Sequence, residues 1–461
     1  MISPTDARTL DANAEALGVP VSRLMDSAGA ALAGFLEERF GDSRAVFVCG
    51  TGNNGGDGFA AALLRDPERT KVSLLKKPSS IRSDIARERY SLLECPIEAY
   101  AGASSFEGFD VIVDCALGTG LSGEVRDPYL QFIRDANLSG KPIVSADVPS
   151  GLGSPDCIRP VATVAFHDSK EGMTEENSGE IVIADIGIPA DAFKKIGPGD
   201  LLRYPVPDKR SHKGQNGRLM IVGGGPYFGA PAMSALSALR TGADIVRVFT
   251  PESSYREVAG ASPVLMVTKL RGNILNYDSL EVILAESEKY DAVLIGPGLG
   301  TDEITMKTAR AFIRSCKIPM VIDADAISAA KGVEARAATV LTPHGGEFSK
   351  LSDGRSPEEV AAEMGAVILK KGAEDVVTDG ARTRINATGT PAMTGAGTGD
   401  VLAGSVAALL SKGMSAFDAA CLGAYICGKA GELAFERLSY GLIATDVINC
   451  IPQVLRDGLR P

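Results

Sequence analysis

Two stretches decide the fold that we expect for this chain: Gly52-Asn53-Asn54-Gly55-Gly56-Asp57-Gly58 and Gly395-Ala396-Gly397-Thr398-Gly399-Asp400. Each glycine cluster carries an aspartate and leads into an apolar segment of helical pattern, residues 59–64 and residues 401–411. A glycine-rich turn at the start of a helix brings backbone N–H groups and the positive end of the helix to a phosphate-bearing ligand. Two such turns predict two active sites.

Short β-branched runs alternate with helical patterns around both stretches. Such runs are typical of buried parallel strands, and they occupy residues 45–49, 71–75, 111–113, 142–145, 219–222, 245–249, 292–295, 320–323, 339–341 and 366–369. The alternation predicts two doubly wound α/β domains. Residues 189–208 are rich in Gly and Pro, so we place a linker near residues 203–210 and predict domains at 1–205 and 206–461.

Composition limits the classes of function. The 461 residues fit two large domains, and the formal net charge of −11 argues against broad nucleic-acid binding. No apolar run reaches the length of a membrane span, and the N-terminus lacks a basic segment followed by an apolar one, so we expect no membrane partner and a cytoplasmic location. The eight cysteines show no Cys-x-x-Cys spacing, which predicts reduced core residues without a zinc site.

The first glycine turn follows the strand at residues 45–49, and two further strands end in aspartates, Asp114 and Asp147. In an open parallel sheet the carboxyl ends of the strands face one crevice, so Asp57, Asp114 and Asp147 should converge there. Three carboxylates in one place need a cation or a proton. The alternative is that they only cap the helices that follow them.

Four segments together resemble the N-terminal epimerase domain of bifunctional NAD(P)H-hydrate repair enzymes, over about residues 1–203: residues 24–29, 52–58, 114–120 and 147–152. The resemblance implies a Rossmann-like three-layer αβα fold, a catalytic and substrate-binding role for Asp147, and a potassium ion held by Asn54, Asp114 and Ser150. It implies hydrate contacts from Asn53, Asn54, Gly55, Gly56, Asp57, Gly118, Thr119, Gly120, Leu121, Ser122, Gly123 and Glu124. The sequence departs from the family where Lys170-Glu171-Gly172 replaces Lys-Pro-Gly and where the loop after Leu152 is short.

The second glycine turn offers groups for phosphoryl transfer. N–H groups at the start of the following helix can stabilise charge on a transferred phosphoryl group, and Asp400 can take a proton from a substrate hydroxyl. A structural cap is the alternative role for Asp400. His344 lies in the turn Thr342-Pro343-His344-Gly345-Gly346-Glu347, which favours a site residue over a packing residue. Lys370 and Lys371 place cations at a strand end suited to nucleotide phosphates.

The order of motifs over residues 207–461 resembles the ADP- or ATP-dependent NAD(P)H-hydrate dehydratases of the ribokinase-like superfamily. The motifs are residues 211–214, 223–230, 296–300, 323–326, 342–347, 371–373 and 397–400. The resemblance implies a ribokinase-like αβα fold with hydrate contacts at Ala230, Gly298, His344 and Asp400. It implies adenine-nucleotide contacts at Lys371, Gly372, Ala373, Glu374, Asp375, Gly397, Thr398 and Gly399.

Together the two resemblances imply an enzyme that epimerises the R and S hydrates of NADH and NADPH and dehydrates the S hydrate at the expense of ADP or ATP. Potassium and magnesium are the implied metal ions, and we expect a homo-oligomer. The alternative function is a ribokinase-like kinase for a vitamin precursor, joined to a non-catalytic scaffold that binds nucleotide or RNA. The Thr-Pro-His-Gly-Gly-Glu loop argues against the kinase, and the presence of Asp147 argues against the scaffold.

Overall fold

The computed structural model describes residues 1–120 and 123–459. The chain forms two compact units, residues 1–192 and residues 193–461, and helix α7 (Ala190–Lys194) spans their junction. This division, between residues 192 and 193, comes earlier in the chain than the boundary at residues 205 and 206 that the sequence predicts. None of the helices in the described part of the chain has the length and apolar character that a membrane span requires.

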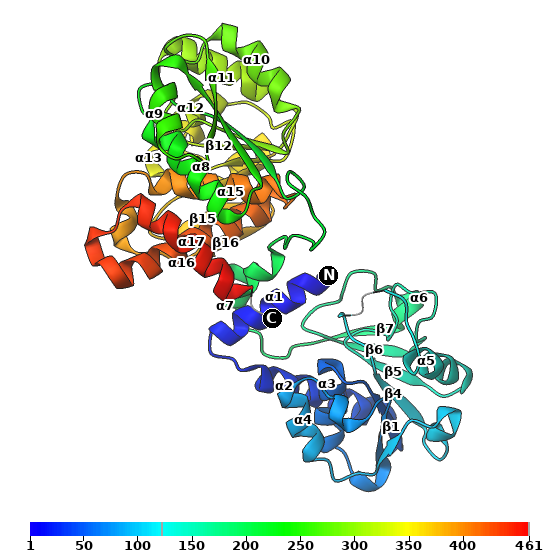
Figure 1. Ribbon diagram of the computed structural model, residues 1–461. Helices are drawn as coiled ribbons and strands as arrows, with labels where there is room; N and C mark the ends of the chain where they lie inside the picture. Colours follow the sequence, from blue (N-terminus) through cyan, green and yellow to red (C-terminus); the bar gives the residue numbers. More distant parts are fainter. Residues whose placement is uncertain (121–122, 460–461) are drawn as a thin grey trace. The chain divides into compact units, whose positions relative to one another are not determined.

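In the described residues, the first unit is built on a seven-stranded parallel sheet in the order β3-β2-β1-β4-β5-β6-β7 (Figure 1). The strands are β1 (Ala45–Cys49), β2 (Thr70–Leu74), β3 (Ile97–Ala99), β4 (Val111–Cys115), β5 (Ile143–Ala146), β6 (Ala162–Phe166) and β7 (Glu180–Ala184). The helices are α1 (Pro4–Ala16), α2 (Val21–Phe40), α3 (Asn53–Leu63), α4 (Asp84–Ser91), α5 (Tyr129–Leu138) and α6 (Glu175–Ser178). The strand order reverses between β1 and β4, and this is where an open α/β sheet binds its ligand.

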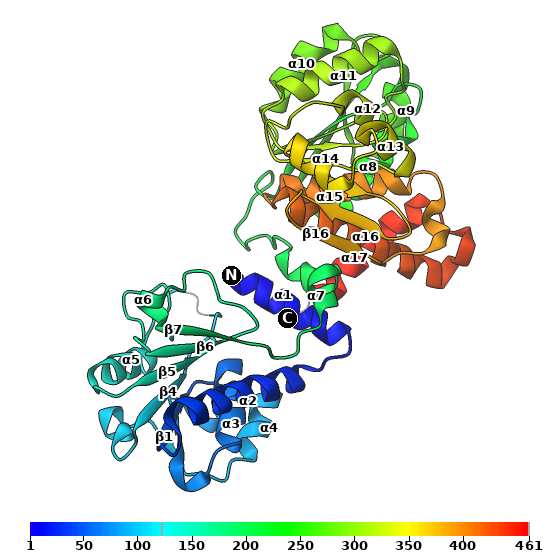
Figure 2. The ribbon, with the colours of Figure 1, turned by 180° about the vertical axis from the view of Figure 1, so that it is seen from behind.

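Helices cover both faces of this sheet, as Figures 1 and 2 show. Val46 and Val48 of β1 share a core with Phe132 and Ile133 of α5, while α2, α3 and α4 lie on the opposite face. A Cβ at Gly29 of α2 would lie 2.5 Å from the Cβ of Ala60 in α3. The glycine therefore permits the close approach of these two helices, and the Rossmann-like αβα prediction is confirmed.

The second unit contains a nine-stranded sheet in the order β10-β9-β8-β11-β12-β13-β14-β15-β16, parallel except for β15 and β16. Its strands are β8 (Arg218–Val222), β9 (Ile245–Pro251), β10 (Met266–Leu270), β11 (Ala292–Ile295), β12 (Met320–Ile322), β13 (Thr339–Leu341), β14 (Val367–Lys370), β15 (Asp375–Thr378) and β16 (Thr383–Asn386). Its helices are α8 (Gly229–Thr241), α9 (Tyr255–Gly260), α10 (Tyr277–Ser287), α11 (Glu303–Ser315), α12 (Ala326–Ala330), α13 (Gly345–Ser352), α14 (Pro357–Met364), α15 (Thr398–Ser411), α16 (Ala416–Leu438) and α17 (Ala444–Gly458).

Two hydrophobic cores lie on the two faces of the second sheet. Leu219 and Ile221 of β8 pack with α8, α15, α16 and α17, whereas Met220 and Val222 pack with the layer formed by α10 to α14. Alternate residues of one strand thus serve opposite layers, as a strand buried on both faces requires. The doubly wound αβα prediction is confirmed for this unit as well.

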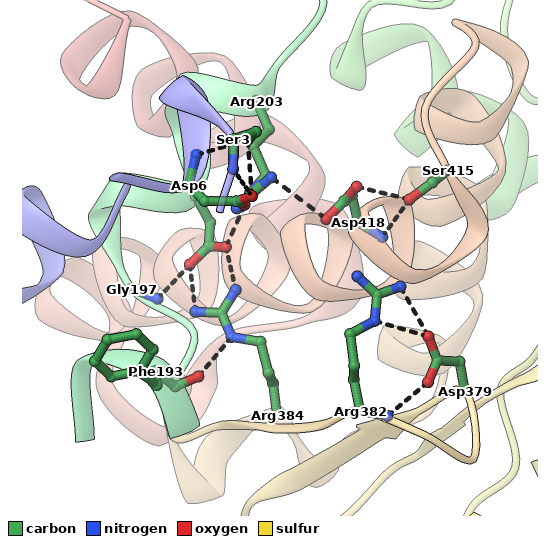
Figure 3. Close-up of polar contacts among 11 residues, drawn as sticks. Ser3, Asp6, Phe193, Gly197, Arg203, Asp379, Arg382, Arg384, Ser415 and Asp418 are labelled. Atoms are coloured by element: carbon green, nitrogen blue, oxygen red, sulfur yellow. Dashed lines mark hydrogen bonds and ion pairs between the residues drawn. The ribbon is translucent and has the colours of Figure 1, made fainter. Parts of the chain in front are cut away.

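Arg384 of β16 fixes the first residues of the second unit (Figure 3). Its Nη2 lies 2.9 Å from Oδ2 of Asp200 and 2.6 Å from the carbonyl oxygen of Lys195, and its Nε donates to the carbonyl of Phe193. The Asp200 side chain is 1% exposed, so this ion pair is buried. Residues 193–203 are therefore an integral part of the second unit.

Candidate active sites

A cavity of about 530 Å³ lies at the carboxyl ends of the central strands of the first unit. Its walls come from the turns after β1, β2, β4 and β5, from the end of β6, and from one face each of α1 and α2. Seven of the residues predicted to bind the hydrate line it: Asn53, Asn54, Asp57, Gly118, Thr119, Gly120 and Asp147. The topology thus brings residues from three separate strand ends to one ligand-sized space.

Asp147 comes directly after β5 and has a φ of 64°, an unusual value for a residue other than glycine. Its Oδ1 forms an ion pair with Nζ of Lys170 and accepts a hydrogen bond from the backbone N–H of Phe166. Nζ of Lys170 also donates to the carbonyl of Phe166 over 2.7 Å, and the side chain is 3% exposed. Lys170 is thus a buried partner for the predicted catalytic residue, whereas in the sequence it is noted only as part of a motif that departs from the family at Glu171.

Two further carboxylates share this cavity, Asp57 and Asp11. Burial raises the pKa of Asp57 well above its usual range, the charges of Asp147 and Asp11 raise it further, and Lys170 opposes them. Burial, followed by the charge of Asp147, raises the pKa of Asp11 to about 6. The cavity can therefore hold a proton near neutral pH on groups other than Asp147.

Asp11 is a residue that sequence reasoning missed, because an aspartate in an amphipathic helix usually faces solvent. Its position depends on residues distant in sequence. The N–H of Ile2 donates to the carbonyl of Ser169 over 2.8 Å, and the N–H of Glu171 donates to the carbonyl of Ile2 over 3.0 Å. This short pairing holds the start of α1 beside Lys170, so the helix lines the cavity.

The residues predicted to hold potassium meet around the turn after β4, and Asn54 is the one of the three that lines the cavity. Asp114 is fully buried, and its Oδ2 accepts from Oγ of Ser145 (2.9 Å) and from the N–H of Ser150 (2.8 Å). Oγ of Ser150 donates to Oδ1 of Asp114, and Nδ2 of Asn54 donates to the carbonyl of Leu117. Oδ1 of Asn54 is buried and has no hydrogen-bond partner among the described residues. The unpaired oxygen of Asn54 is available as a ligand for a hard cation, whereas both oxygens of the Asp114 carboxylate already accept hydrogen bonds.

The other predicted contacts in this loop differ in their surroundings. Gly55 and Gly56 are buried in α3, where a Cβ would lie 2.3 Å from the carbonyl oxygen of Gly50 and 2.5 Å from Cε of Met25, respectively. Packing alone therefore requires these glycines. Gly123 and Glu124 are exposed, and Leu121 and Ser122 lie outside the described residues.

Asp400 lies in the first turn of α15, which begins after Gly397. Gly397 has a φ of 95°, and a Cβ there would lie 2.5 Å from Sδ of Met233. Burial raises the pKa of Asp400 to about 7; Asp323 and Asp325 contribute to the increase, whereas Lys371 opposes it. A carboxylate with this pKa can both accept and release a proton near neutral pH, as a general base must.

Lys371 follows β14 and points toward the glycine turn. Its Nζ lies 2.9 Å from Oδ1 of Asp323 and 3.3 Å from the position that a Cβ at Gly399 would take. Asp323 is 2% exposed and also accepts a hydrogen bond of 2.6 Å from Oγ1 of Thr342. Asp323 is a second residue that the sequence did not single out as a contact, although its motif is part of the resemblance.

His344 caps helix α13. Its Nδ1 accepts hydrogen bonds from the backbone N–H of Gly346 (3.0 Å) and of Glu347 (3.3 Å), and its own N–H donates to Glu347. The hydrogen bonds to Nδ1 assign the proton of the neutral ring to Nε2. The N–H of Lys371 donates to the carbonyl of Pro343, so His344 and Lys371 are held side by side.

The remaining predicted residues of the second unit fall into two groups. Ala230 lies in the first turn of α8. Gly298 approaches the residues just before that helix, since a Cβ at Gly298 would lie 2.0 Å from the carbonyl oxygen of Tyr227. Residues 371–375 form a turn in which Asp375 accepts from the N–H of Gly372 and from Nδ2 of Asn386. Ala373 and Glu374 are exposed in that turn, and Oγ1 of Thr398 donates to the carbonyl of Met393.

Comparison with protein families divides the chain in the same way. The model for NAD(P)H-hydrate dehydratases matches residues 219–453, and the model for the YjeF-related protein N-terminus matches residues 21–172. The first match covers the second unit, with Lys371 and Asp400, and the second covers most of the first unit, with Asp147 and Lys170.

Relatives and solved structures agree with these matches. The bifunctional NAD(P)H-hydrate repair enzyme Nnr of Pyrobaculum aerophilum is 39% identical to this chain, and the match covers 99% of this chain and 98% of the relative. The enzyme of the same name from Methanothermobacter thermautotrophicus is 40% identical, with coverage of 99% and 96%. An ADP/ATP-dependent NAD(P)H-hydrate dehydratase from Bacillus subtilis, co-crystallised with ATP and Mg²⁺, has a TM-score of 0.51 and 24% identity, over 58% of this chain and 99% of that one. A ribokinase-like superfamily protein from Enterococcus faecalis has a TM-score of 0.52 and 22% identity, over 58% and 97%. These two structures support the fold of the second unit, and the full-length relatives show that the chain belongs to the family of bifunctional NAD(P)H-hydrate repair enzymes.

Proposed function

We propose that the first unit is the epimerase and the second the dehydratase, with Asp147 and Asp400 as their catalytic residues. As a member of this family, the chain repairs nicotinamide nucleotides: it interconverts the R and S hydrates of NADH and NADPH and returns the S hydrate to NADH or NADPH at the expense of ADP or ATP. The observation that carries the assignment of roles is that each aspartate lies at a strand end or helix start near glycines and within the electrostatic influence of a lysine, Lys170 for Asp147 and Lys371 for Asp400.

In the dehydratase, the obstacle is that hydroxide is a poor leaving group. Asp400 takes the proton of the C6 hydroxyl while the hydroxyl oxygen attacks the terminal phosphoryl group of ADP or ATP, and the bond to the rest of the nucleotide breaks. The lone pair of the ring nitrogen then expels phosphate from C6, and loss of a proton from C5 restores the double bond. Lys371 and the first N–H groups of α15 are placed to stabilise the transferred phosphoryl group.

In the epimerase, the reacting carbon bears both a hydroxyl and the ring nitrogen. Asp147 takes the hydroxyl proton, the oxygen forms a C=O bond, and the C6–N1 bond opens with its electron pair on nitrogen, which is protonated. Rotation and closure on the other face of the carbonyl give the second epimer. Asp11 and Asp57, whose pKa values are raised, are candidates to supply and recover the nitrogen's proton.

Two metal ions belong to this proposal. Asn54, Asp114 and Ser150 would hold potassium, where the ion would contribute positive charge and fix the loops at the bottom of the crevice. Magnesium would bind chiefly to the phosphates of the nucleotide, with Asp323 and Asp325 as nearby carboxylates. In the described part of the chain, no group of three or more His, Cys, Asp or Glu side chains forms a metal site of its own.

The test is to incubate the purified chain with racemic NADH hydrate and ADP, ATP or no nucleotide. Complete recovery of NADH with one of the nucleotides, and equilibration of the epimers without nucleotide, would support both roles. Accumulation of a stable phosphorylated product would instead indicate a kinase.

Three further expectations stay predictions. The sequence predicts a domain boundary at residues 205 and 206, whereas the compact units divide between residues 192 and 193. We also expect a homo-oligomer in solution and a reaction in the cytoplasm, where the nucleotide substrates are made. Limited proteolysis and sedimentation would test the first two. All eight cysteines are free, which fits a reducing compartment.

A further inference from the structure

The strand order of the first unit gives the direction in which a dinucleotide must lie in the cavity. Asp147 follows β5, the start of α3 follows β1, and Lys76 follows β2, with the strands adjacent in the order β2-β1-β4-β5. Neighbouring strands are about 4.8 Å apart, so the ends of β2 and β5 are about 14 Å apart. A nicotinamide ring at Asp147 and a pyrophosphate at the start of α3 therefore place the adenosine half at the end of β2.

Two cations line the cavity at this end, Lys76 and Arg82. Nζ of Lys76 lies 5.2 Å from the ring centre of Tyr129, another lining residue. The N–H of Arg82 donates to the carbonyl of Thr51 over 3.0 Å, which ties Arg82 to the glycine turn. Over residues 1–120 and 123–459, neither cation pairs with a carboxylate, although the chain as a whole is acidic.

The residue type after the second strand distinguishes the two nicotinamide nucleotides in this fold. A carboxylate there binds the free 2′-hydroxyl of the adenosine ribose, whereas a cation accommodates a 2′-phosphate. Residues 75–83 contain two lysines and an arginine and no Asp or Glu. A phosphate monoester carries about −1.5 to −2 charges at neutral pH, so two uncompensated cations suit it.

We propose that Lys76 and Arg82 bind the 2′-phosphate of NADPH hydrate and make the epimerase prefer NADPH hydrate to NADH hydrate. The proposal rests on the epimerase function of the first unit. The start of α3 binds the pyrophosphate, which both substrates share, so the two cations act on the one group that differs between them.

The experiment compares Lys76→Met, Arg82→Gln and the double variant with Lys77→Met. Lys77 is the exposed neighbour that does not line the cavity, so it controls for the loss of a surface charge. Without ADP or ATP the dehydratase cannot consume substrate, and chromatography follows the conversion of the R to the S hydrate. We expect each single change to lower kcat/KM for NADPH hydrate about tenfold, equivalent to about 1.4 kcal/mol. NADH hydrate should lose less than about twofold, and Lys77→Met should resemble the wild type.

An equal loss for both hydrates would overturn the proposal, because it would assign the cations to the pyrophosphate. Unchanged kinetics in the double variant would overturn it as well. Calorimetric binding of ADP-ribose and of its 2′-phosphate provides a measurement that needs no turnover. The second unit is the same in every variant, so a change in the ratio of the two Kd values belongs to the first unit. A wild type that epimerises neither hydrate would contradict the proposed function, and the Kd ratio would still decide the role of the cations.

Discussion

At the scale of single residues, the proposed base Asp400 predicts how dehydration depends on pH. Its pKa is raised to about 7 by burial and by Asp323, and the proposed base works only when ionised. The kcat for S-hydrate should therefore rise with pH between about 6 and 8 and level off above. Asp400→Asn should lower the rate by about 10² to 10⁴ and leave epimerisation intact. A flat profile in the wild type, or near-normal dehydration by the variant, would show that another group accepts the proton.

Lys371 raises a different question at the same scale, because it pairs with Asp323 and is also the proposed contact for the nucleotide phosphates. Removing the lysine alone leaves a buried carboxylate without its partner, which costs about 3–5 kcal/mol in comparable pairs. Lys371→Met should therefore lower both the melting temperature and the affinity for ADP. Lys371→Met combined with Asp323→Asn should recover most of the melting temperature but not the affinity.

Calorimetry and thermal unfolding of these two variants separate the roles of Lys371. If the double variant regained ADP affinity, the lysine would act only by neutralising Asp323, and Lys370 or Lys213 would become candidates for the phosphate contact. Lys370 is at the end of β14, where its Nζ lies 5.4 Å from the ring centre of Phe348.

Most of the site residues that the sequence predicts lie in or next to turns that contain glycine, where the local pattern is visible without the fold. Asp147 and Asp400 are of this kind. Lys170 and Asp11 reach the cavity only through the pairing of Ile2 with residues 169–171, a contact between distant parts of the chain that no local pattern contains. Lys170 stands in a motif that departs from the family only at Glu171, and Asp11 has no local signal.

At the scale of elements, the buried pair of Arg384 and Asp200 holds residues 193–203 to the second unit (Figure 3). Arg384→Met would leave the Asp200 carboxylate and two backbone carbonyls without this donor. We expect the free energy of unfolding of the second unit to fall by about 3–5 kcal/mol. Arg382→Met is the matched control, since Arg382 is 63% exposed beside Asp379 and should cost at most about 1 kcal/mol. Similar denaturant midpoints for the two variants, measured by circular dichroism, would contradict a stabilising role for the pair of Arg384 and Asp200.

Strand prediction succeeded where a run is apolar and buried on both faces. The predicted runs within β1, β4, β8 and β11, at residues 45–49, 111–113, 219–222 and 292–295, contain only hydrophobic residues, and the sheet buries each of them. The hairpin of β15 and β16 escaped prediction because it lies at the sheet edge, is partly exposed and carries polar residues such as Arg384. β6 is buried, but it follows a Gly/Pro-rich segment that suggests a loop.

At the scale of the whole molecule, the two proposed active sites serve one repair reaction, and the catalytic residues proposed for each, Asp147 and Asp400, belong to different units. A change in one site should leave the other intact. Asp147→Asn keeps the size of the side chain beside Lys170, so it tests chemistry better than a truncation does. This variant should convert pure S-hydrate to NADH at a near-normal rate.

On racemic hydrate with excess nucleotide, Asp147→Asn should stop at about half conversion, apart from slow spontaneous epimerisation, because the R epimer has no route to the dehydratase. The absorbance of NADH follows the reaction. Adding Asp400→Asn, which lacks the dehydratase base but keeps the epimerase, should then carry the reaction to completion, although neither variant completes it alone. Full conversion by Asp147→Asn at the wild-type rate would remove Asp147 from the epimerase mechanism. Failure of the mixture to complete the reaction would mean that the R epimer must pass between two sites of the same chain.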